Sequence, residues 1–147
     1  TMAFDPNIRP ALWVDTRSVV DALTAAAEVS SIVLPTHADE VPYFGDADDE
    51  ATAQRYLSAG CVEVVVKNGA DPALVVTGGG QWRVGARTVA SVVDATGAGD
   101  SFNGGYLAAR LAGANPEDAA EAGHATASVV IGHHGALIPK EALKRAF

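Results

Sequence analysis

The sequence predicts an α/β protein in which helices cover a mostly parallel sheet. Short apolar runs alternate with segments of helical periodicity along nearly all of the 147 residues, and this alternation is typical of a parallel sheet. Apolar residues make up 48% of the chain, which is enough for a buried core and argues against disorder. Polar and charged residues follow several expected strands, where open α/β sheets bind their ligands.

Five segments carry the signals of helices. In the first, apolar residues recur on one face, and Thr16 stands where a capping residue is expected. The second ends before Gly60, because glycine readily adopts the left-handed conformation that follows a helix. The third begins at a pair of glycines. The expected helices span residues 16–28, 48–58, 98–111, 116–131 and 140–145.

Six short apolar runs are expected to be strands. Pro35 stops the second run, and a turn signal at Asn68 and Gly69 follows the third. Three glycines at 78–80 form a tight turn after the fourth. Residues 73–93 are therefore expected to be an antiparallel region within the sheet. The expected strands span residues 2–4, 31–34, 62–67, 73–77, 81–84 and 88–93.

Composition and charge narrow the classes of function. The formal net charge is −8 and no basic cluster occurs, so binding to nucleic acid or to a membrane surface is not expected. The single cysteine, Cys61, cannot form an intrachain disulfide, and we expect it in the core of a protein of the reducing cytoplasm. We recognise neither a signal peptide nor a run of about 18 apolar residues in this sequence.

Residues 94–102, with the sequence Asp-Ala-Thr-Gly-Ala-Gly-Asp-Ser-Phe, are the most informative segment. The β-branched run at 88–93 leads into them, so the pattern predicts a strand, a glycine turn and a helix. The first amides of a helix have no partner inside it, and with the helix dipole they form an anion site. Gly97 and Gly99 remove side chains, so an anion can approach the backbone closely.

Asp100 places a carboxylate beside this anion site. Capping explains part of the choice, because aspartate is favourable in the first turn of a helix. A second role explains it better: the carboxylate could take a proton from a hydroxyl while the amides hold the phosphoryl group being transferred. The alternative is a capped helix behind a glycine turn, with no chemistry.

These residues resemble the C-terminal signature of the ribokinase-like, or PfkB, sugar kinases. The opening segment, residues 4–13, is similar to the Asp-x-Asn-x-Arg segment of that family, closest to its 2-keto-3-deoxygluconate kinase branch. The resemblance implies a three-layer α/β sandwich with a mostly parallel sheet, of which only the C-terminal portion is present. Residues 1–147 would be the nucleotide-binding portion of a longer kinase, without its N-terminal sugar-binding and lid portion.

The resemblance also implies roles for individual residues. Asp100 would be the catalytic base and would contact the substrate, and the anion hole would be built from Gly97, Ala98 and Gly99. Arg9 would bind the carboxylate of a sugar acid, for which the paired donors of a guanidinium are suited. Without the resemblance, a surface arginine is an equally good interpretation of Arg9.

The nucleotide side would include Lys67, which follows an expected strand. A solvated lysine at a strand end is the alternative for this residue. The helix and loop near the C-terminus resemble the wall beside the adenine. The residues assigned to the nucleotide are Lys67, Gly69, Gly97, Gly99, His124 and Ser128.

ATP and Mg²⁺ are the cofactors that the resemblance implies, and some members also hold K⁺ at loop carbonyls matching those near Asp94 and Ala136. Many members carry Asn-x-x-Glu near the magnesium, where this chain has an expected loop at 36–40. Anchoring on the flanking Pro and Gly places Asp39 at the glutamate, and a register shift of one places Glu40 there. Either carboxylate could hold a magnesium-bound water.

The function expected from these residues is ATP-dependent phosphorylation of a small sugar acid, most closely 2-keto-3-deoxygluconate. The alternatives are a PfkB kinase acting on a neutral sugar or a nucleoside, and a non-catalytic nucleotide-binding α/β module. The 147 residues alone are expected to be inactive. Self-association into a homo-oligomer is also expected, because an absent N-terminal portion would leave apolar surface or strand edges uncovered.

Overall fold

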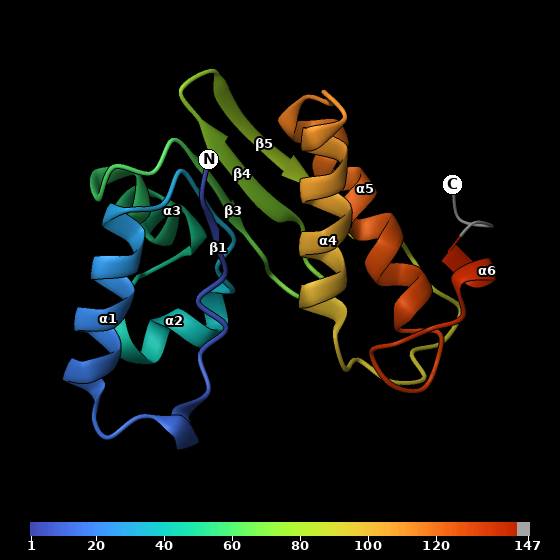
Figure 1. Ribbon diagram of the computed structural model, residues 1–147, viewed down its shortest axis with the longest axis horizontal. Helices are drawn as coiled ribbons and strands as arrows, with labels where there is room; N and C mark the ends of the chain where they lie inside the picture. The colour runs from blue at the N-terminus through green and yellow to red at the C-terminus, as the bar shows by residue number, and fades with distance from the viewer. Residues whose placement is uncertain (144–147) are drawn as a thin grey trace. The chain divides into compact units, whose positions relative to one another are not determined.

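The computed structural model describes residues 1–143 of the chain, and these divide into two compact units after residue 83 (Figure 1). Each unit is described by itself. The first contains most of a five-stranded sheet and the helices α1 to α3, and the second is built on two long helices. The expected α/β class is confirmed.

The sheet has its strands in sequence order, β1-β2-β3-β4-β5. β1 pairs with β2 and β2 with β3 in parallel, whereas β3 and β4 are antiparallel, with Val65 opposite Val75. The carboxyl ends of the first three strands therefore lie at one edge of the sheet. The strands span Ala3–Phe4, Ile32–Val33, Glu63–Val66, Ala73–Thr77 and Gly80–Val84.

Three helices and a short 3-10 turn connect the strands of the first unit. Asp15 caps α1 by accepting the Ser18 amide at 2.7 Å, and Asp48 caps α3 by accepting the Ala51 amide at 2.7 Å. Thr16 is the first residue of α1, so its prediction as the cap was wrong by one position. The helical segments are η1 (Pro10–Leu12), α1 (Thr16–Glu28), α2 (His37–Phe44) and α3 (Asp49–Ser58).

The main core of the first unit lies between α3 and the central strands. Tyr56 and Leu74 are its largest apolar members, each at most 1% exposed. Cys61 is buried in this core, with its Sγ donating to the Ala27 carbonyl at 3.4 Å, and burial raises the pKa of its thiol. The core members are Ala27, Val33, Ala53, Tyr56, Cys61, Val64, Val66 and Leu74. The expected place of Cys61 in the core is confirmed.

The second unit packs α4 (Ala98–Leu111) against α5 (Pro116–Val130), and Figure 1 shows the two helices side by side. Glycine permits this close approach, since a Cβ on Gly123 would lie 2.9 Å from the Phe102 ring. A Cβ on Gly105 would likewise meet the Thr126 side chain. A short helix, α6 (Lys140–Leu143), follows, and the last two residues of the helix expected at 140–145 lie outside the described residues.

Two sequence expectations are corrected. Residues 88–93 form no strand: the amides of Val93 and Asp94 bond to the Ile131 carbonyl, at 2.8 and 3.2 Å, in place of a ladder partner. The expected loop at 36–40 is instead the entry to α2, a helix that contains Pro42 and ends at Phe44. Gly45 adopts φ +69° and closes this helix.

Candidate active site

The carboxyl ends of β1, β2 and β3 bring three polar segments together in the first unit. Asp5 follows β1, Thr36 lies beyond β2, and Lys67 follows β3 directly. Lys67 extends the parallel pairing: its amide donates to the Pro35 carbonyl at 2.8 Å, and its carbonyl accepts the His37 amide at 3.1 Å. The polar segments that follow β1 and β2 therefore lie at the same edge of the sheet.

Lys67 is a buried charge held by a carboxylate. Its side chain is only 10% exposed, and its Nζ lies 2.9 Å from Oδ2 of Asp5. The alternative of a solvated lysine is therefore wrong. The other oxygen of Asp5 accepts the Asn7 amide at 3.1 Å, which closes the turn that leads to Arg9. Arg9 is exposed, and its Nη1 donates to the Ile8 carbonyl at 3.2 Å.

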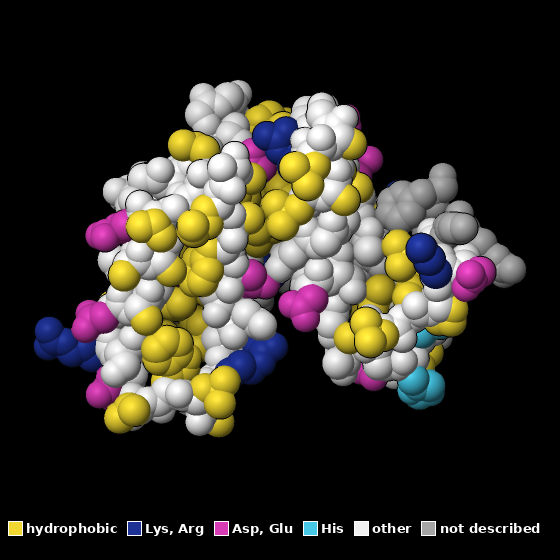
Figure 2. Space-filling model, viewed as in Figure 1, with side chains coloured by type: hydrophobic (Ala, Val, Ile, Leu, Met, Phe, Trp, Pro, Cys, Tyr) yellow, Lys and Arg dark blue, Asp and Glu magenta, His cyan; other side chains and the backbone are white. Residues whose placement is uncertain are grey.

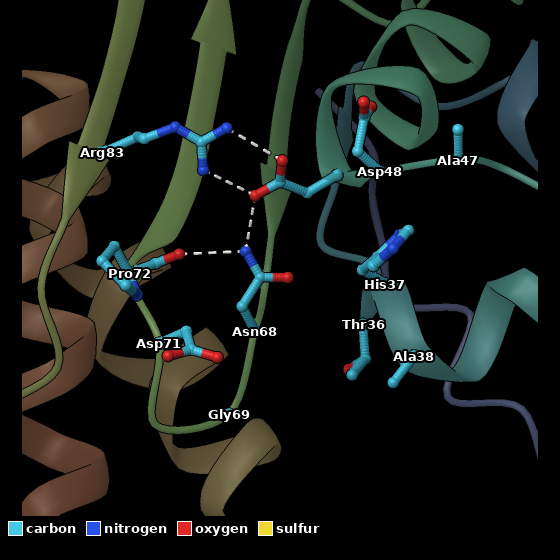
Figure 3. A pocket seen from close by; sticks show the side chains of 11 residues that line it. Thr36, His37, Ala38, Ala47, Asp48, Asn68, Gly69, Asp71, Pro72 and Arg83 are labelled. Carbon is cyan, nitrogen blue, oxygen red and sulfur yellow. Dashed lines mark hydrogen bonds and ion pairs between the residues drawn. The ribbon is translucent and has the colours of Figure 1, made fainter.

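A hollow of about 590 Å³ lies beside this edge in the first unit (Figure 3). Asp49 forms part of its wall and accepts hydrogen bonds from both terminal nitrogens of Arg83, at 2.7 and 2.9 Å, and from the side-chain Nδ2 of Asn68 at 2.7 Å. The Arg83 hydrogen bonds hold the pKa of Asp49 below its ordinary value. The lining residues are Thr36, His37, Ala38, Ala47, Asp48, Asp49, Asn68, Gly69, Asp71, Pro72 and Arg83.

The two candidate magnesium residues lie in different surroundings. Glu40 is fully buried: Tyr56 donates to it at 2.8 Å and Arg55 at 2.7 Å. Burial raises the pKa of Glu40, although both donors favour its charged form. Asp39 is exposed in the first turn of α2. Among residues 1–143 no group of three or more His, Cys, Asp or Glu side chains is placed to hold a metal ion.

Arg55 ties α2 to α3 through two carboxylates. Besides Glu40 it pairs with Asp46 at 2.7 Å, and its guanidinium lies 3.6 Å from the centre of the Phe44 ring. Thr52 donates to Asp46 at 2.9 Å and also contacts His37 Nδ1 at 2.9 Å. This network fixes the first turn of α2, where Asp39 lies.

The glycine turn lies in the second unit, at the start of α4. Gly97 has φ +76°, and a Cβ there would lie 2.5 Å from that of Ala136, so both conformation and space require glycine. The Ala98 amide bonds to the Ala95 carbonyl at 3.1 Å. Within the described residues no acceptor faces the amides of Gly99 or Asp100. The Asp100 side chain is exposed next to these open donors.

Asp94 joins the glycine turn to the loop at 133–136. Its Oδ1 accepts the Thr96 amide at 2.8 Å and its Oδ2 the Gly135 amide at 2.9 Å. Hydrogen bonds from the Thr96 hydroxyl, the Thr96 amide and the Gly135 amide lower the pKa of Asp94 to about 2. Sequence reasoning missed this role, although aspartate two residues before threonine is a typical signal for such a turn.

His124 and Ser128 lie on α5 in unlike settings. The His124 ring is buried edge-on to Phe102, with centroids 4.9 Å apart, and its Nε2 donates to the Val84 carbonyl at 3.0 Å. Burial lowers the pKa of this histidine. Ser128 is half-buried, and its hydroxyl donates to the Ala125 carbonyl at 2.7 Å. The His124 ring thus joins α5 to Val84, whereas the Ser128 hydroxyl bonds within α5 itself.

Comparison with known families supplies the identity of the fold. Residues 1–143 match the model of the pfkB family carbohydrate kinases. The chain belongs to the pfkB family. The resemblance read from the glycine turn is therefore confirmed across nearly the whole sequence.

Curated relatives include 2-dehydro-3-deoxygluconokinases. The chain is 44% identical to the one from Escherichia coli K12 and 41% identical to the one from Dickeya dadantii. Each match covers 95% of this chain and 46% of the relative. The chain thus spans about half the length of these relatives.

Solved structures confirm the ribokinase-like fold. A PfkB protein from Polaromonas has a TM-score of 0.83 at 30% identity, covering 99% of this chain and 46% of that one. The aminoimidazole riboside kinase of Salmonella enterica, solved with aminoimidazole riboside and an ATP analogue, has a TM-score of 0.84 at 27% identity, covering 98% and 51%. A putative ribokinase II from E. coli, solved with ATP and Mg²⁺, has a TM-score of 0.81 at 29% identity, covering 98% and 46%.

Proposed function

We propose that the complete gene product transfers the γ-phosphoryl group of ATP to a hydroxyl of 2-dehydro-3-deoxygluconate or a closely related sugar acid. The observation that carries the proposal is the start of α4, where two amides without acceptors stand beside the exposed carboxylate of Asp100. Membership of the pfkB family and 44% identity to a 2-dehydro-3-deoxygluconokinase support the substrate class.

The chemistry follows from these groups. The hydroxyl oxygen of the sugar acid forms a bond to the γ-phosphorus, the bond to the bridging oxygen breaks, and ADP leaves. The hydroxyl proton passes to the Asp100 carboxylate, which must be ionised to accept it. The amides of Gly99 and Asp100, with Gly97 as their turn, stabilise the charge on the transferred group.

The chemistry of residues in each unit supports ATP and Mg²⁺ as cofactors, and a similar ribokinase II was solved with both. Amides at the N-terminus of α4 suit phosphate oxygens, and Gly69, with φ +64°, offers unhindered backbone at the rim of the hollow. Bound Mg²⁺ would neutralise phosphate charge, and the exposed carboxylate of Asp39 would hold it through a water. The Glu40 carboxylate already accepts hydrogen bonds from Arg55 and Tyr56, so we favour Asp39 as the magnesium residue.

A monovalent cation is a finer part of the proposal. Asp94 brings the glycine turn and the loop containing Ala136 together, and such a pair of loops offers carbonyl oxygens. A fructokinase from Vibrio cholerae has been solved with fructose, ADP and a potassium ion. We therefore propose that K⁺ stimulates turnover, and exchanging K⁺ for choline in the assay tests this.

Arg9 supports a sugar acid over a neutral sugar. Its guanidinium is exposed beyond the turn that follows β1, and a planar fork matches a carboxylate with two parallel hydrogen bonds. A neutral sugar or a nucleoside offers no such partner.

The protein is also proposed to work in the cytoplasm, in keeping with a single cysteine and no expected disulfide.

A panel of sugars, sugar acids and nucleosides, each tested with ATP and Mg²⁺ in a coupled ADP assay, tests the proposal. We expect kcat/KM to be highest for 2-dehydro-3-deoxygluconate. Highest kcat/KM for a neutral sugar or a nucleoside would overturn the substrate. Nucleotide binding without turnover on any acceptor would instead indicate a non-catalytic module.

A further inference from the structure

We propose that Lys67 positions the substrate-binding turn, acting through Asp5 on the segment that carries Arg9. This inference rests on the proposed function, in which Arg9 binds the carboxylate of the sugar acid. It differs from the assignment of Lys67 to the nucleotide, because the ammonium group is committed to a carboxylate on the neighbouring parallel strand end.

The position of Lys67 is set by the sheet. Its backbone is held on both sides, by the Pro35 carbonyl at 2.8 Å and the His37 amide at 3.1 Å, so the side chain starts from a fixed point. Its Nζ then meets Asp5 Oδ2 at 2.9 Å, with the lysine side chain 10% and the aspartate side chain 21% exposed. A charge this buried needs its partner, because solvent does not replace the lost attraction.

Asp5 passes this constraint to the following turn. Its Oδ1 accepts the Asn7 amide at 3.1 Å, and Asn7 has φ +39°, a left-handed conformation that costs free energy in a residue other than glycine. Among residues 1–143 Asn7 is the one non-glycine residue with positive φ. The carboxylate therefore helps to hold the turn that leads to Arg9.

This turn also fixes the backbone at Arg9. Ile8 is 4% exposed and packs with Val19 and Leu23, while Pro10 begins η1 immediately afterwards. Arg9 thus projects from a short segment held by a buried side chain, a 3-10 turn and the Asp5 carboxylate. Loss of the Lys67 charge would remove the ion pair that holds Asp5 Oδ2, and the position of the Arg9 guanidinium would be less well fixed.

The test is a double-mutant cycle of Lys67→Met and Asp5→Asn in the complete gene product. Methionine keeps the length of the lysine stem, and asparagine keeps the oxygen that accepts the Asn7 amide. We expect Lys67→Met to raise KM for the sugar acid about tenfold, the scale of one lost charge-assisted hydrogen bond. KM for ATP should change less than twofold, and the double variant should be no worse than Lys67→Met alone.

Two further variants complete the design. Lys140→Met removes an exposed lysine on α6 and should leave both KM values unchanged. Lys67→Arg keeps the charge and should recover part of the KM for the sugar acid, which a loss of folding alone would not explain. If Lys67→Met does not fold, the comparison of Lys67→Arg with Asp5→Asn decides the point.

The inference is overturned if Lys67→Met raises KM for ATP more than KM for the sugar acid, or if the two single effects add in the double variant. Failure of the proposed function shows itself separately, as an inactive or differently specific wild type. In that case, hydrogen exchange of the Asn7 amide, measured in these 147 residues, tests whether Lys67 stabilises the turn. Faster exchange in Lys67→Met than in Lys140→Met supports the link, and equal exchange overturns it.

Discussion

Asp100 stands in the first turn of α4, where its carboxylate is exposed next to amides that have no acceptor among the described residues. Asp100→Asn in the complete gene product should keep ATP binding and lose roughly 10²–10⁴-fold in kcat, the usual contribution of a general base. Asp118→Asn is the matched control, since Asp118 occupies the first turn of α5. Steady-state kinetics and a binding titration check both, and a kcat near the wild-type value would remove Asp100 from the mechanism.

Asp94 is expected to make the folding stability of this chain fall at acidic pH. Folding lowers its pKa from the ordinary 3.8 to about 2, so its stabilising contribution is complete above pH 3.8 and is lost as the pH falls toward 2. We expect Tm of the wild-type chain to fall across this window more steeply than Tm of Asp94→Asn. Glu121→Gln, an exposed change on α5, should follow the wild type. Parallel curves for wild type and Asp94→Asn would contradict the assignment.

At the scale of elements, the joint between α2 and α3 depends on one guanidinium. Arg55→Leu would leave the carboxylates of Glu40 and Asp46 without their cation, and breaking a buried pair costs about 3–5 kcal/mol. Arg17→Leu breaks only the exposed pair with Asp21 and should cost less than about 1 kcal/mol. Urea unfolding of both variants measures the difference, and equal costs would show that the buried network contributes no more than an exposed ion pair.

Much of the element pattern could be predicted because it depends on local signals. Residues 73–77 and 98–111 were predicted as observed, since glycines bound the strand and the helix at one end. Residues 88–93 were predicted wrongly, because a β-branched run forms a strand only where a ladder partner exists, and Ile131 supplies a carbonyl instead. α2 was missed because its anchor, buried Glu40, finds its partners on α3.

The candidate site shows the same division. The glycine turn could be predicted since its residues are contiguous, and the turn itself places the amides of Gly99 and Asp100. The Asp49–Arg83 pair joins residues 34 apart and the Lys67–Asp5 pair residues 62 apart, so no local pattern indicates either. Such pairs follow from the order of strands in the sheet and become visible only with the fold.

At the scale of the whole molecule, the chain spans 46% of the length of its E. coli relative. We therefore expect these 147 residues to fold and to bind ATP at most weakly, without phosphorylating a sugar acid. Catalysis needs both reactants held together and water excluded, which a partial site does not achieve. Titration calorimetry and a coupled assay check this, and sugar-dependent turnover by the purified chain would contradict it.

Apolar side chains reach the surface of each unit, and Figure 2 shows them along α1 and around η1. In the first unit, Leu12 at the end of η1 is 80% exposed and Val14 is 93% exposed. In the second unit, Leu111 is 91% and Leu137 95% exposed. Self-association of this chain stays a prediction that sedimentation velocity can check. No helix among residues 1–143 combines the length and apolar character needed to cross a bilayer.

Cys61 makes the protein a convenient host for chemical labels. It is the single sulfhydryl of the chain, it is 4% exposed, and burial keeps it in the unreactive protonated form. A cysteine introduced at an exposed position such as Gln54 would therefore react with maleimide dyes almost alone, with no need to remove the native residue. Fluorescence of the attached dye could then follow nucleotide addition in a protein whose core residues are unchanged.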